Sequence, residues 1–159
     1  MRFSSILFIF FFVAASFTQA QRPDISHLNF YKCDYTDTTS YYKVLSSGSK
    51  TETTEVWGVD KNLLDSLPSL TEMNLDLEKV ASNAKIYLEN RYYYPNTNKE
   101  YKLTEISFVR ANPKKEDSKN WIIIFKFLYD ERGFYQYVPI LLDGRIVLSS
   151  NEKTEYYKK

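Results

Sequence analysis

The fold is decided by the stretch Trp121–Leu148, which reads Trp-Ile-Ile-Ile-Phe-Lys-Phe-Leu-Tyr-Asp-Glu-Arg-Gly-Phe-Tyr-Gln-Tyr-Val-Pro-Ile-Leu-Leu-Asp-Gly-Arg-Ile-Val-Leu. β-Branched and aromatic residues dominate three runs of this stretch, and such residues favour the pleated, packed surface of a strand. Two turn signals separate the runs, Asp130–Gly133 and Asp143–Gly144. The stretch therefore predicts an antiparallel meander of three strands.

The second turn signal also predicts a register. Asp-Gly between apolar runs is the strongest short-range signal for a hairpin, because a type I′ turn needs a positive φ at both central residues. A two-residue turn at Asp143–Gly144 places Leu142 opposite Arg145 and Leu141 opposite Ile146.

Alternation along the first run separates two faces of the predicted sheet. One face carries aromatic and aliphatic side chains and is the expected core face: Trp121, Ile123, Phe125, Phe127 and Tyr129. The other face is wetter because it contains Lys126, but it is apolar enough that we expect another element to cover part of it. Pro139 cannot donate to a ladder, so we expect a bulge or bend there, with the missing N–H facing the first run.

An amphipathic helix precedes the meander. Asp76 is a good N-cap residue, and Leu75 and Val80 stand at the N′ and N4 positions of a hydrophobic staple. Apolar residues at helical spacing form one stripe: Leu77, Val80, Ala81, Ala84, Tyr87 and Leu88. An earlier start at Ser69, with Glu72 completing a capping box, is the alternative.

Two further strands are expected. Residues 101–110 predict a strand with Thr104, Ile106 and Phe108 on one face and Leu103, Glu105, Ser107 and Val109 on the other. Residues 53–59 predict a strand along an edge of the main sheet. A long sheet cannot bury a face alone, so the helix must cover it. The predicted fold is α+β, with one main helix packed on a four- to five-stranded antiparallel meander sheet.

The chain divides into four parts by composition. Residues 1–20 predict a signal peptide, with a positive start at Arg2, an apolar stretch Ile6–Ala15 and small residues before a cleavage point after Ala20. An uncleaved anchor helix is the alternative. Residues 21–68 form a β-rich lead segment, 69–150 the helix-and-sheet core, and 151–159 a charged tail that we expect to fray. The mature protein is therefore expected to be secreted or periplasmic, without a membrane association after cleavage.

Several chemistries are disfavoured by composition. Removing Arg2 from the 21 basic residues leaves 20, which equals the number of acidic residues, so a nucleic-acid partner is not expected. The four glycines form no phosphate loop, and one His with one Cys supplies no metal site, so no cofactor is expected. Cys33 is interpreted as a small buried hydrophobe, with a reactive or intermolecular thiol as the alternative.

Tyrosine is the residue type that suggests binding. The chain has 14 tyrosines, and two groups of them stand out: Tyr92, Tyr93 and Tyr94 after the helix, and Tyr135 and Tyr137 on one strand face. Phenol rings offer a broad contact area at low entropic cost, so they recur in peptide and sugar sites. Cross-strand aromatic packing is the alternative. An exposed edge strand is a further way to bind a partner, by strand addition.

The order of helix and strands resembles the cystatin-like folds, and within them the PepSY-type modules of secreted bacterial proteins. The resemblance covers Leu75–Leu148 and depends on the helix, the strand around Leu103–Val109, and an ending with an Asp-Gly turn and a short strand. It implies a domain that binds or restrains proteases, or an accessory domain. The cystatin inhibitory sequence Gln-x-Val-x-Gly is not present, since Gln136–Ile140 lacks its glycine.

Three functions follow as hypotheses. The first is an exported, non-enzymatic domain that binds a protein, a peptide or a small molecule. The second is a small enzyme that uses carboxylates in a cystatin-like cavity, with Asp130 and Asp143 as the acidic candidates, although both lie in predicted turns. The third is a structural envelope protein that forms a homodimer through its sheet.

Overall fold

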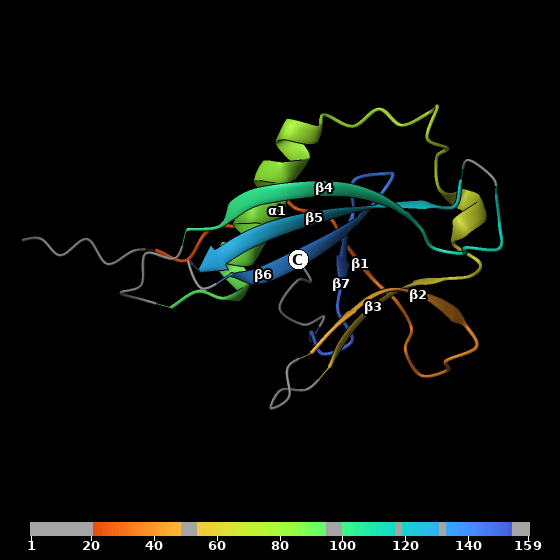
Figure 1. Cartoon of the computed structure of the whole chain (residues 1–159), viewed down its shortest axis with the longest axis horizontal. Helices are drawn as coiled ribbons and strands as arrows, with labels where there is room; N and C mark the ends of the chain where they lie inside the picture. The colour runs from red at the N-terminus through yellow and green to blue at the C-terminus, as the bar shows by residue number, and fades with distance from the viewer. Residues whose placement is uncertain (1–20, 49–53, 95–99, 117–118, 131–132, 154–159) are drawn as a thin grey trace, which may run out of the picture.

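The computed structural model describes residues 21–48, 54–94, 100–116, 119–130 and 133–153 (Figure 1). These ranges contain the helix α1 (Leu77–Arg91), a short 3-10 helix (Leu64–Ser66) and the strands β1 (Phe30–Lys32), β2 (Tyr41–Ser47), β3 (Glu55–Asp60), β4 (Lys102–Arg110), β5 (Trp121–Asp130), β6 (Phe134–Leu141) and β7 (Ile146–Leu148). Five strands form one sheet in the order β1-β7-β6-β5-β4, and β2 pairs with β3 in a separate hairpin. The predicted α+β class is confirmed. The predicted signal peptide and residues 154–159 lie outside the described residues.

The helix begins where its cap predicts. The Asp76 carboxylate accepts the N–H groups of Glu78 and Lys79 at 3.0 and 3.1 Å, which satisfies two donors of the first turn. The alternative start is wrong, although its local contacts form. The Ser69 N–H donates to the Glu72 carboxylate at 3.0 Å, and the Glu72 N–H donates to the Ser69 carbonyl at 3.1 Å, which closes a single turn.

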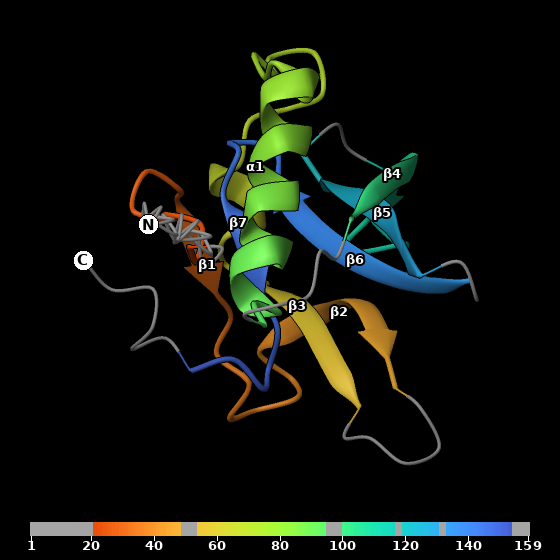
Figure 2. The same cartoon turned by 90° about the vertical axis from the view of Figure 1, so that its left-hand side faces the viewer.

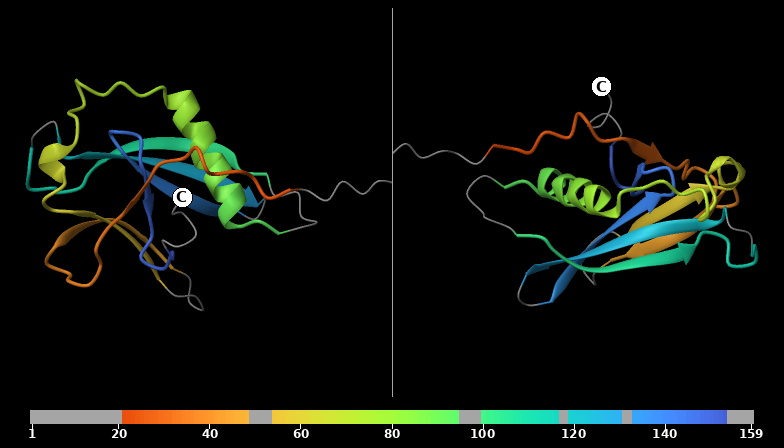
Figure 3. Two further views of the ribbon diagram at one scale, coloured as in Figure 1. Left: turned by 180° about the vertical axis from the view of Figure 1, so that it is seen from behind. Right: turned by 90° about the horizontal axis from the view of Figure 1, so that it is seen from above.

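The helix side of the sheet is the main core. Ile123, Phe125 and Phe127 of β5 are buried among Ala84 and Leu88 of α1. This confirms the predicted core face, and it confirms that the apolar stripe of the helix packs on it at Ala84 and Leu88. Seen from above in Figure 3, α1 lies between the segment that precedes β1 and the strands β4, β5 and β6. The segment before β1 therefore crosses α1 on the side of the helix that points away from these strands.

The opposite side of the sheet, called here the outer face, is covered only in part. Ile122 and Leu141 are buried there against Trp57 and Val59 of the β2–β3 hairpin. The hairpin diverges from β4, β5 and β6 as it leaves the body of the molecule (Figure 2). The expectation of partial cover is thus confirmed, but the prediction of the 53–59 strand as an edge of the main sheet is wrong. That strand pairs with β2 instead.

The lead segment contributes β1 to the main sheet as a parallel partner of β7. Phe30 lies opposite Ile146, and the Ile146 N–H donates to the Asn29 carbonyl at 2.9 Å. The four strands β4 to β7 form the predicted antiparallel meander. The complete sheet is therefore mostly antiparallel, with one parallel pair at its edge.

The predicted register at the second turn is wrong by one residue. The Gly144 N–H donates to the Leu141 carbonyl, and the Leu141 N–H donates to the Arg145 carbonyl, both at 2.9 Å. With Gly144 at φ 88°, this is a three-residue loop with a left-handed glycine rather than a type I′ turn. Ile140 consequently lies opposite Ile146. A one-residue slip reverses the faces of a strand, and this register turns Ile146 toward the helix side, where it is buried.

Pro139 also behaves differently from the expectation. It lies opposite Ile124 in a regular stretch of the β5–β6 ladder, so no bulge forms there. Because Leu141 directs its N–H toward the residue after the turn, the position two residues earlier faces the same side. The missing N–H of Pro139 thus faces β7 and not β5. The β6–β7 ladder is correspondingly short, with a single pair between Ile140 and Ile146.

A register shift in β4 changes which of its residues share a face. The shift lies between Leu103 and Glu105, so Thr104 is the extra residue of a β-bulge. The prediction that Leu103 shares a face with Glu105 is therefore wrong. Residues opposite one another in an antiparallel pair share a face, and the helix-side pairs are Leu103 with Phe127, Ile106 with Phe125, and Phe108 with Ile123. We call Leu103, Ile106 and Phe108 the apolar row.

Candidate functional site

The structure places Tyr135 and Tyr137 on one side of the sheet and Tyr92 on the other. Tyr135 and Tyr137 are on the outer face of β6, opposite Leu128 and Lys126 of β5. Tyr92 is on the helix side, where it packs against the main core. The structure therefore does not bring the two groups together in one site.

The group after the helix is partly engaged in holding the helix end. The Arg91 guanidinium lies 4.9 Å from the centre of the Tyr92 ring, and Tyr92 is half-buried. The Tyr93 N–H donates to the Asn90 carbonyl at 3.3 Å. Tyr94 is the most exposed of the three, at 60%. Helix termination accounts for the first two residues, which leaves Tyr94 as the most accessible ring of this group.

The second group belongs to a surface that we call the outer-face patch, made of Glu105, Lys126, Leu128, Tyr135 and Tyr137. The Lys126 Nζ lies 4.3 Å from the centre of the Tyr135 ring and 3.4 Å from Oε2 of Glu105. Tyr135 is 42% exposed, whereas Pro139 on the same strand face is buried. Exposure on this face therefore increases along β6 from the buried Pro139 to the half-buried Tyr137 and the exposed Tyr135.

The chemistry of the patch is that of a contact surface. The Ser107 hydroxyl donates to Oε1 of Glu105 at 2.6 Å, and this bond together with Lys126 holds the pKa of Glu105 below its usual value. A carboxylate with a lowered pKa is a poor proton donor near neutral pH. The patch therefore offers two phenol faces, an aliphatic side chain, a cation and an anion, but no poised acid.

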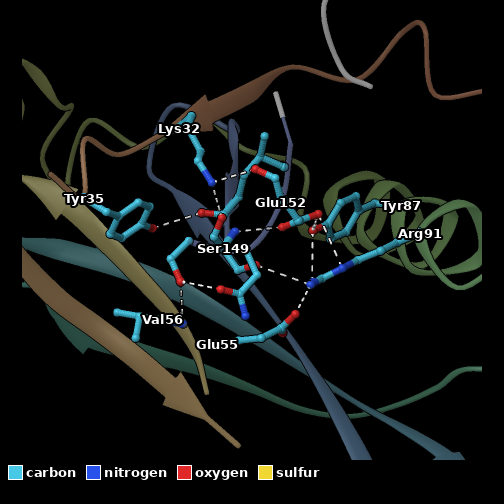
Figure 4. A network of polar contacts seen from close by, with 11 residues as sticks. Lys32, Tyr35, Glu55, Val56, Tyr87, Arg91, Ser149 and Glu152 are labelled. Carbon is cyan, nitrogen blue, oxygen red and sulfur yellow. Dashed lines mark hydrogen bonds and ion pairs between the residues drawn. The ribbon is translucent and has the colours of Figure 1, made fainter. Parts of the chain in front are cut away.

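A second candidate is a polar cluster at the end of α1. Figure 4 shows the Arg91 side chain between Glu55 of β3 and Glu152 of the segment after β7. The Tyr87 hydroxyl donates to Oε1 of Glu152 at 2.5 Å, and the Ser149 N–H donates to Oε2 at 2.7 Å. Both oxygens of this buried carboxylate are thus engaged by protein groups.

Lys32 and Tyr35 extend the same cluster along the chain. The Lys32 ammonium donates to the carbonyl oxygens of Ser149 and Glu152, and its pKa is lowered, mainly by burial. The Tyr35 hydroxyl donates to the Leu148 carbonyl at 3.1 Å and accepts the Gly58 N–H at 3.0 Å. The cluster therefore ties the end of α1, β1, β3 and the segment after β7 together. We interpret it as a structural clamp.

No local pattern in the sequence predicts this clamp. Glu152 lies in the segment that we expected to fray, yet its side chain has three partners. The Tyr87 and Glu152 side chains are separated by 65 positions along the chain. Only the folded arrangement brings these side chains together.

Cys33 is buried, as its first interpretation predicts. Its Sγ lies 3.4 Å from a carboxylate oxygen of Asp60. Burial, and then the negative charge of Asp60, raise the pKa of Cys33 to about 12. The thiol is thus protonated at neutral pH, which disfavours the reactive alternative.

Asp143, one of the acidic candidates for catalysis, is a turn residue, because its carboxylate accepts the N–H and the Nε–H of Arg145 at 3.2 and 2.8 Å.

Two other kinds of site are absent from the part of the chain that the structure describes. No group of three or more His, Cys, Asp or Glu side chains there is arranged to hold a metal ion. No helix in the same ranges is both long and apolar enough to cross a membrane. Comparison with known proteins gives no match, whether with a family model, a curated protein or a solved structure. The geometry of the molecule alone therefore carries the functional argument.

Proposed function

We propose that this chain is an exported, non-catalytic binding domain that recognises a polypeptide through the outer-face patch. The observation that carries the proposal is the exposed Tyr135 ring, which lies beside Lys126 and Leu128 on two central strands. Side chains on paired strands are held more rigidly than side chains on loops. A tyrosine held in this way contributes a large contact area with little loss of entropy on binding.

The composition of the patch favours a peptide with an apolar or aromatic residue next to an acidic one. The rings of Tyr135 and Tyr137 suit the apolar or aromatic residue of the peptide. Lys126 suits the acidic residue of the peptide. Its partner within the chain is Glu105, whose side chain is 54% exposed. An exposed ion pair contributes at most about 1 kcal/mol, so an acidic group of the ligand can replace Glu105 at small cost.

The main core supports binding over carboxylate catalysis. The β5 side chains that face α1 are apolar and buried, namely Ile123, Phe125 and Phe127. The hypothesis of an enzyme with a cystatin-like cavity needs inward carboxylates at this place. The buried Glu152 carboxylate lies instead in the clamp, where Arg91 and Tyr87 engage it.

A cystatin-like identity is part of the proposal. A single helix followed by a four-stranded antiparallel meander, α1 and then β4 to β7, supports it. The strand β1, parallel to β7, is an addition to that plan. Val138 and Ile140 of the segment Gln136–Ile140 are buried within β6, so this segment does not act as an inhibitory loop. The proposed binding therefore uses the sheet face instead.

Export and the site are tested separately. Secretion of the full chain by a host cell, followed by N-terminal sequencing, is expected to give a mature protein that begins at Gln21.

To test binding, a library of random peptides displayed on phage is selected on residues 21–159, and the affinity of each selected peptide is measured by fluorescence anisotropy. Tyr135→Ala is expected to weaken binding by at least about tenfold, because truncation of a central tyrosine in an interface commonly costs 1–2 kcal/mol or more.

The matched control is Tyr94→Ala, which removes another exposed tyrosine ring, outside the patch. It is expected to leave the affinity unchanged. Selected peptides that bind equally well to the Tyr135→Ala variant would contradict the proposed site. Turnover of peptide, glycan or ester substrates by the purified chain would contradict the proposed class of function.

A further inference from the structure

The strand β4 has a free edge and an apolar side at the same place. Within the described residues it is the last strand of the sheet, and no strand lies on its other side (Figure 2). The apolar row on its helix side remains exposed at 38%, 37% and 39% for Leu103, Ile106 and Phe108. Three of the six large hydrophobic side chains that are exposed among those residues therefore belong to this one strand and share one face.

The direction of the backbone groups along this edge follows from one hydrogen bond. The Ala111 N–H, directly after β4, donates to the Asn120 carbonyl at 2.9 Å and so points toward the β5 side. Backbone groups alternate along a strand, so Val109 and Ser107 also point toward β5. Ile106 and Phe108 then direct their N–H and C=O groups to the free edge. The residues with exposed apolar side chains are those with unpaired backbone groups.

The centre of this edge lacks the usual protection against pairing. Natural edge strands are commonly protected by a lysine, a proline, a bulge or an inward charge. In β4 the bulge lies at Thr104, near one end, and the segment Ile106–Val109 is uncharged. The nearest charges are engaged within the chain. Glu105 is paired with Lys126, and the Arg110 guanidinium lies 5.0 Å from the Trp121 ring.

We propose that β4 pairs with β4 of a second copy of this chain, antiparallel across a two-fold axis, with Ser107 opposite Ser107 of that copy. This register places Ile106 opposite Phe108 of the second copy, and the symmetry repeats the pair. Pairs of an aromatic and a β-branched residue are among the favourable cross-strand pairs. The two apolar rows then meet on the helix side, between the two α1 helices.

Self-complementarity distinguishes this register from its neighbours. A centre one residue earlier, at Ile106, sets Lys102 opposite Arg110 of the second copy, and like charges directly opposite are destabilising. A centre at Phe108 sets Ile106 opposite Arg110. With the centre at Ser107, Arg110 faces the uncharged Thr104. The sequence of β4 therefore favours itself as the partner, in one register.

The pairing leaves the outer-face patch accessible, so it does not depend on the proposed peptide site. Tyr135 and Tyr137 lie on β6, two strands away from the seam. The symmetric sheet would carry two patches on one continuous face. A ligand with two binding segments would then gain affinity from simultaneous binding.

The first test is sedimentation equilibrium of residues 21–159. A single pair of strands with two apolar rows is a small interface, so we expect a reversible dimer in the micromolar range. Phe108→Lys is expected to raise the dissociation constant at least about tenfold, because each copy then places a charge in the apolar seam. Circular dichroism confirms that the variant is folded. A chain that stays monomeric at all concentrations would overturn the proposal.

The second test detects the proposed β4–β4 register by disulfide cross-linking. Ser107 points toward β5, so across the free edge it forms a pair without hydrogen bonds, in which Cα atoms lie about 4.5 Å apart. That separation suits a disulfide. Ser107→Cys is therefore expected to cross-link the dimer under mild oxidation. The parent chain, with its buried Cys33, is expected to stay uncross-linked.

The matched control is Glu105→Cys on the same strand face. In the proposed register Glu105 lies opposite Val109 of the second copy, so the two introduced thiols are four positions apart, roughly 13 Å. No cross-link is expected. Equal cross-linking of the two variants would overturn the register. Peptide binding at Tyr135 in a strictly monomeric chain would overturn the dimer and leave the proposed function standing.

Discussion

The two sides of the main sheet are closed by different kinds of contact. On the helix side, hydrocarbon closes the core, with Phe125 and Phe127 buried against α1. On the hairpin side, the apolar cluster around Trp57 is bordered by hydroxyl and ionic contacts from Tyr35 and Arg91. The first contact is broad and non-directional, whereas the second depends on a few placed groups. The comparison teaches that apolar packing dominates the helix side, whereas the hairpin side also depends on placed polar groups.

The helix side is expected to give the largest loss of stability. Phe125→Ala removes a fully buried ring, and such truncations cost about 3–5 kcal/mol because a cavity remains. Urea unfolding should show a lower midpoint with an unchanged slope. The control Phe134→Ala, at a ring that is 55% exposed, is expected to cost less than about 1 kcal/mol. Similar losses for the two variants would mean that the helix does not close this core.

The clamp is expected to give the next largest effect. Arg91→Met keeps an unbranched apolar stem in place of the arginine stem but leaves the Glu152 carboxylate, 7% exposed at its side chain, without the Arg91 cation. Removing one partner of a buried pair costs about 3 kcal/mol, so the midpoint of urea unfolding should fall clearly.

The control for the clamp is Lys85→Met, which breaks a surface pair with Glu89 at 3.9 Å on the same helix. We expect a loss of only about 0.3–0.5 kcal/mol from it. If Arg91→Met costs no more than this control, the cluster does not hold the hairpin side together.

Removing the hydroxyl group is expected to have different effects at the structural Tyr35 and at the surface Tyr135. Tyr35→Phe removes the donor to Leu148 and the acceptor of the Gly58 N–H, so we expect a loss of about 1–2 kcal/mol. Burial raises the pKa of Tyr35, which keeps its proton available for the Leu148 carbonyl. Tyr135→Phe is the control at the patch, with an expected change near zero. Equal thermal shifts for the two variants would remove the distinction.

The helix side could be predicted from the sequence because its signals are local. The Asp76 cap, the apolar stripe of α1 and the alternation along β5 each act over a few residues. The register of the last turn could not be predicted, because Asp-Gly fits both a two-residue turn and a three-residue loop with a left-handed glycine. Only the burial of Ile146 on the helix side decides between them.

The hairpin side could not be predicted because its partners are distant in the chain. β1 pairs in parallel with a strand 116 positions later, and no turn sequence predicts that pair. In the candidate site, alternation placed Tyr135 and Tyr137 together, and Lys126 marked the wetter face. The exposed apolar row was missed in part, because the bulge at Thr104 moves Leu103 onto the face of Ile106 and Phe108.

The smallest expected effect concerns Cys33, which belongs to the apolar cluster on the hairpin side and contacts the Asp60 carboxylate. Its thiol is buried, and burial together with Asp60 raises its pKa to about 12. Reaction with a thiol reagent requires the thiolate and access to it, and the folded chain offers neither at pH 8. We therefore expect no labelling by 5,5′-dithiobis(2-nitrobenzoate) in native buffer.

Asp60→Asn separates the two causes of this inertness. It removes the neighbouring charge but leaves the thiol buried, so labelling should remain slow and should follow the rate of unfolding in urea. Fast labelling of this variant in native buffer would show that charge, and not burial, protects the thiol. Fast labelling of the parent chain would show that the hairpin side opens readily. The helix-side core, which is closed mainly by apolar side chains, would then be the more firmly closed side of the sheet.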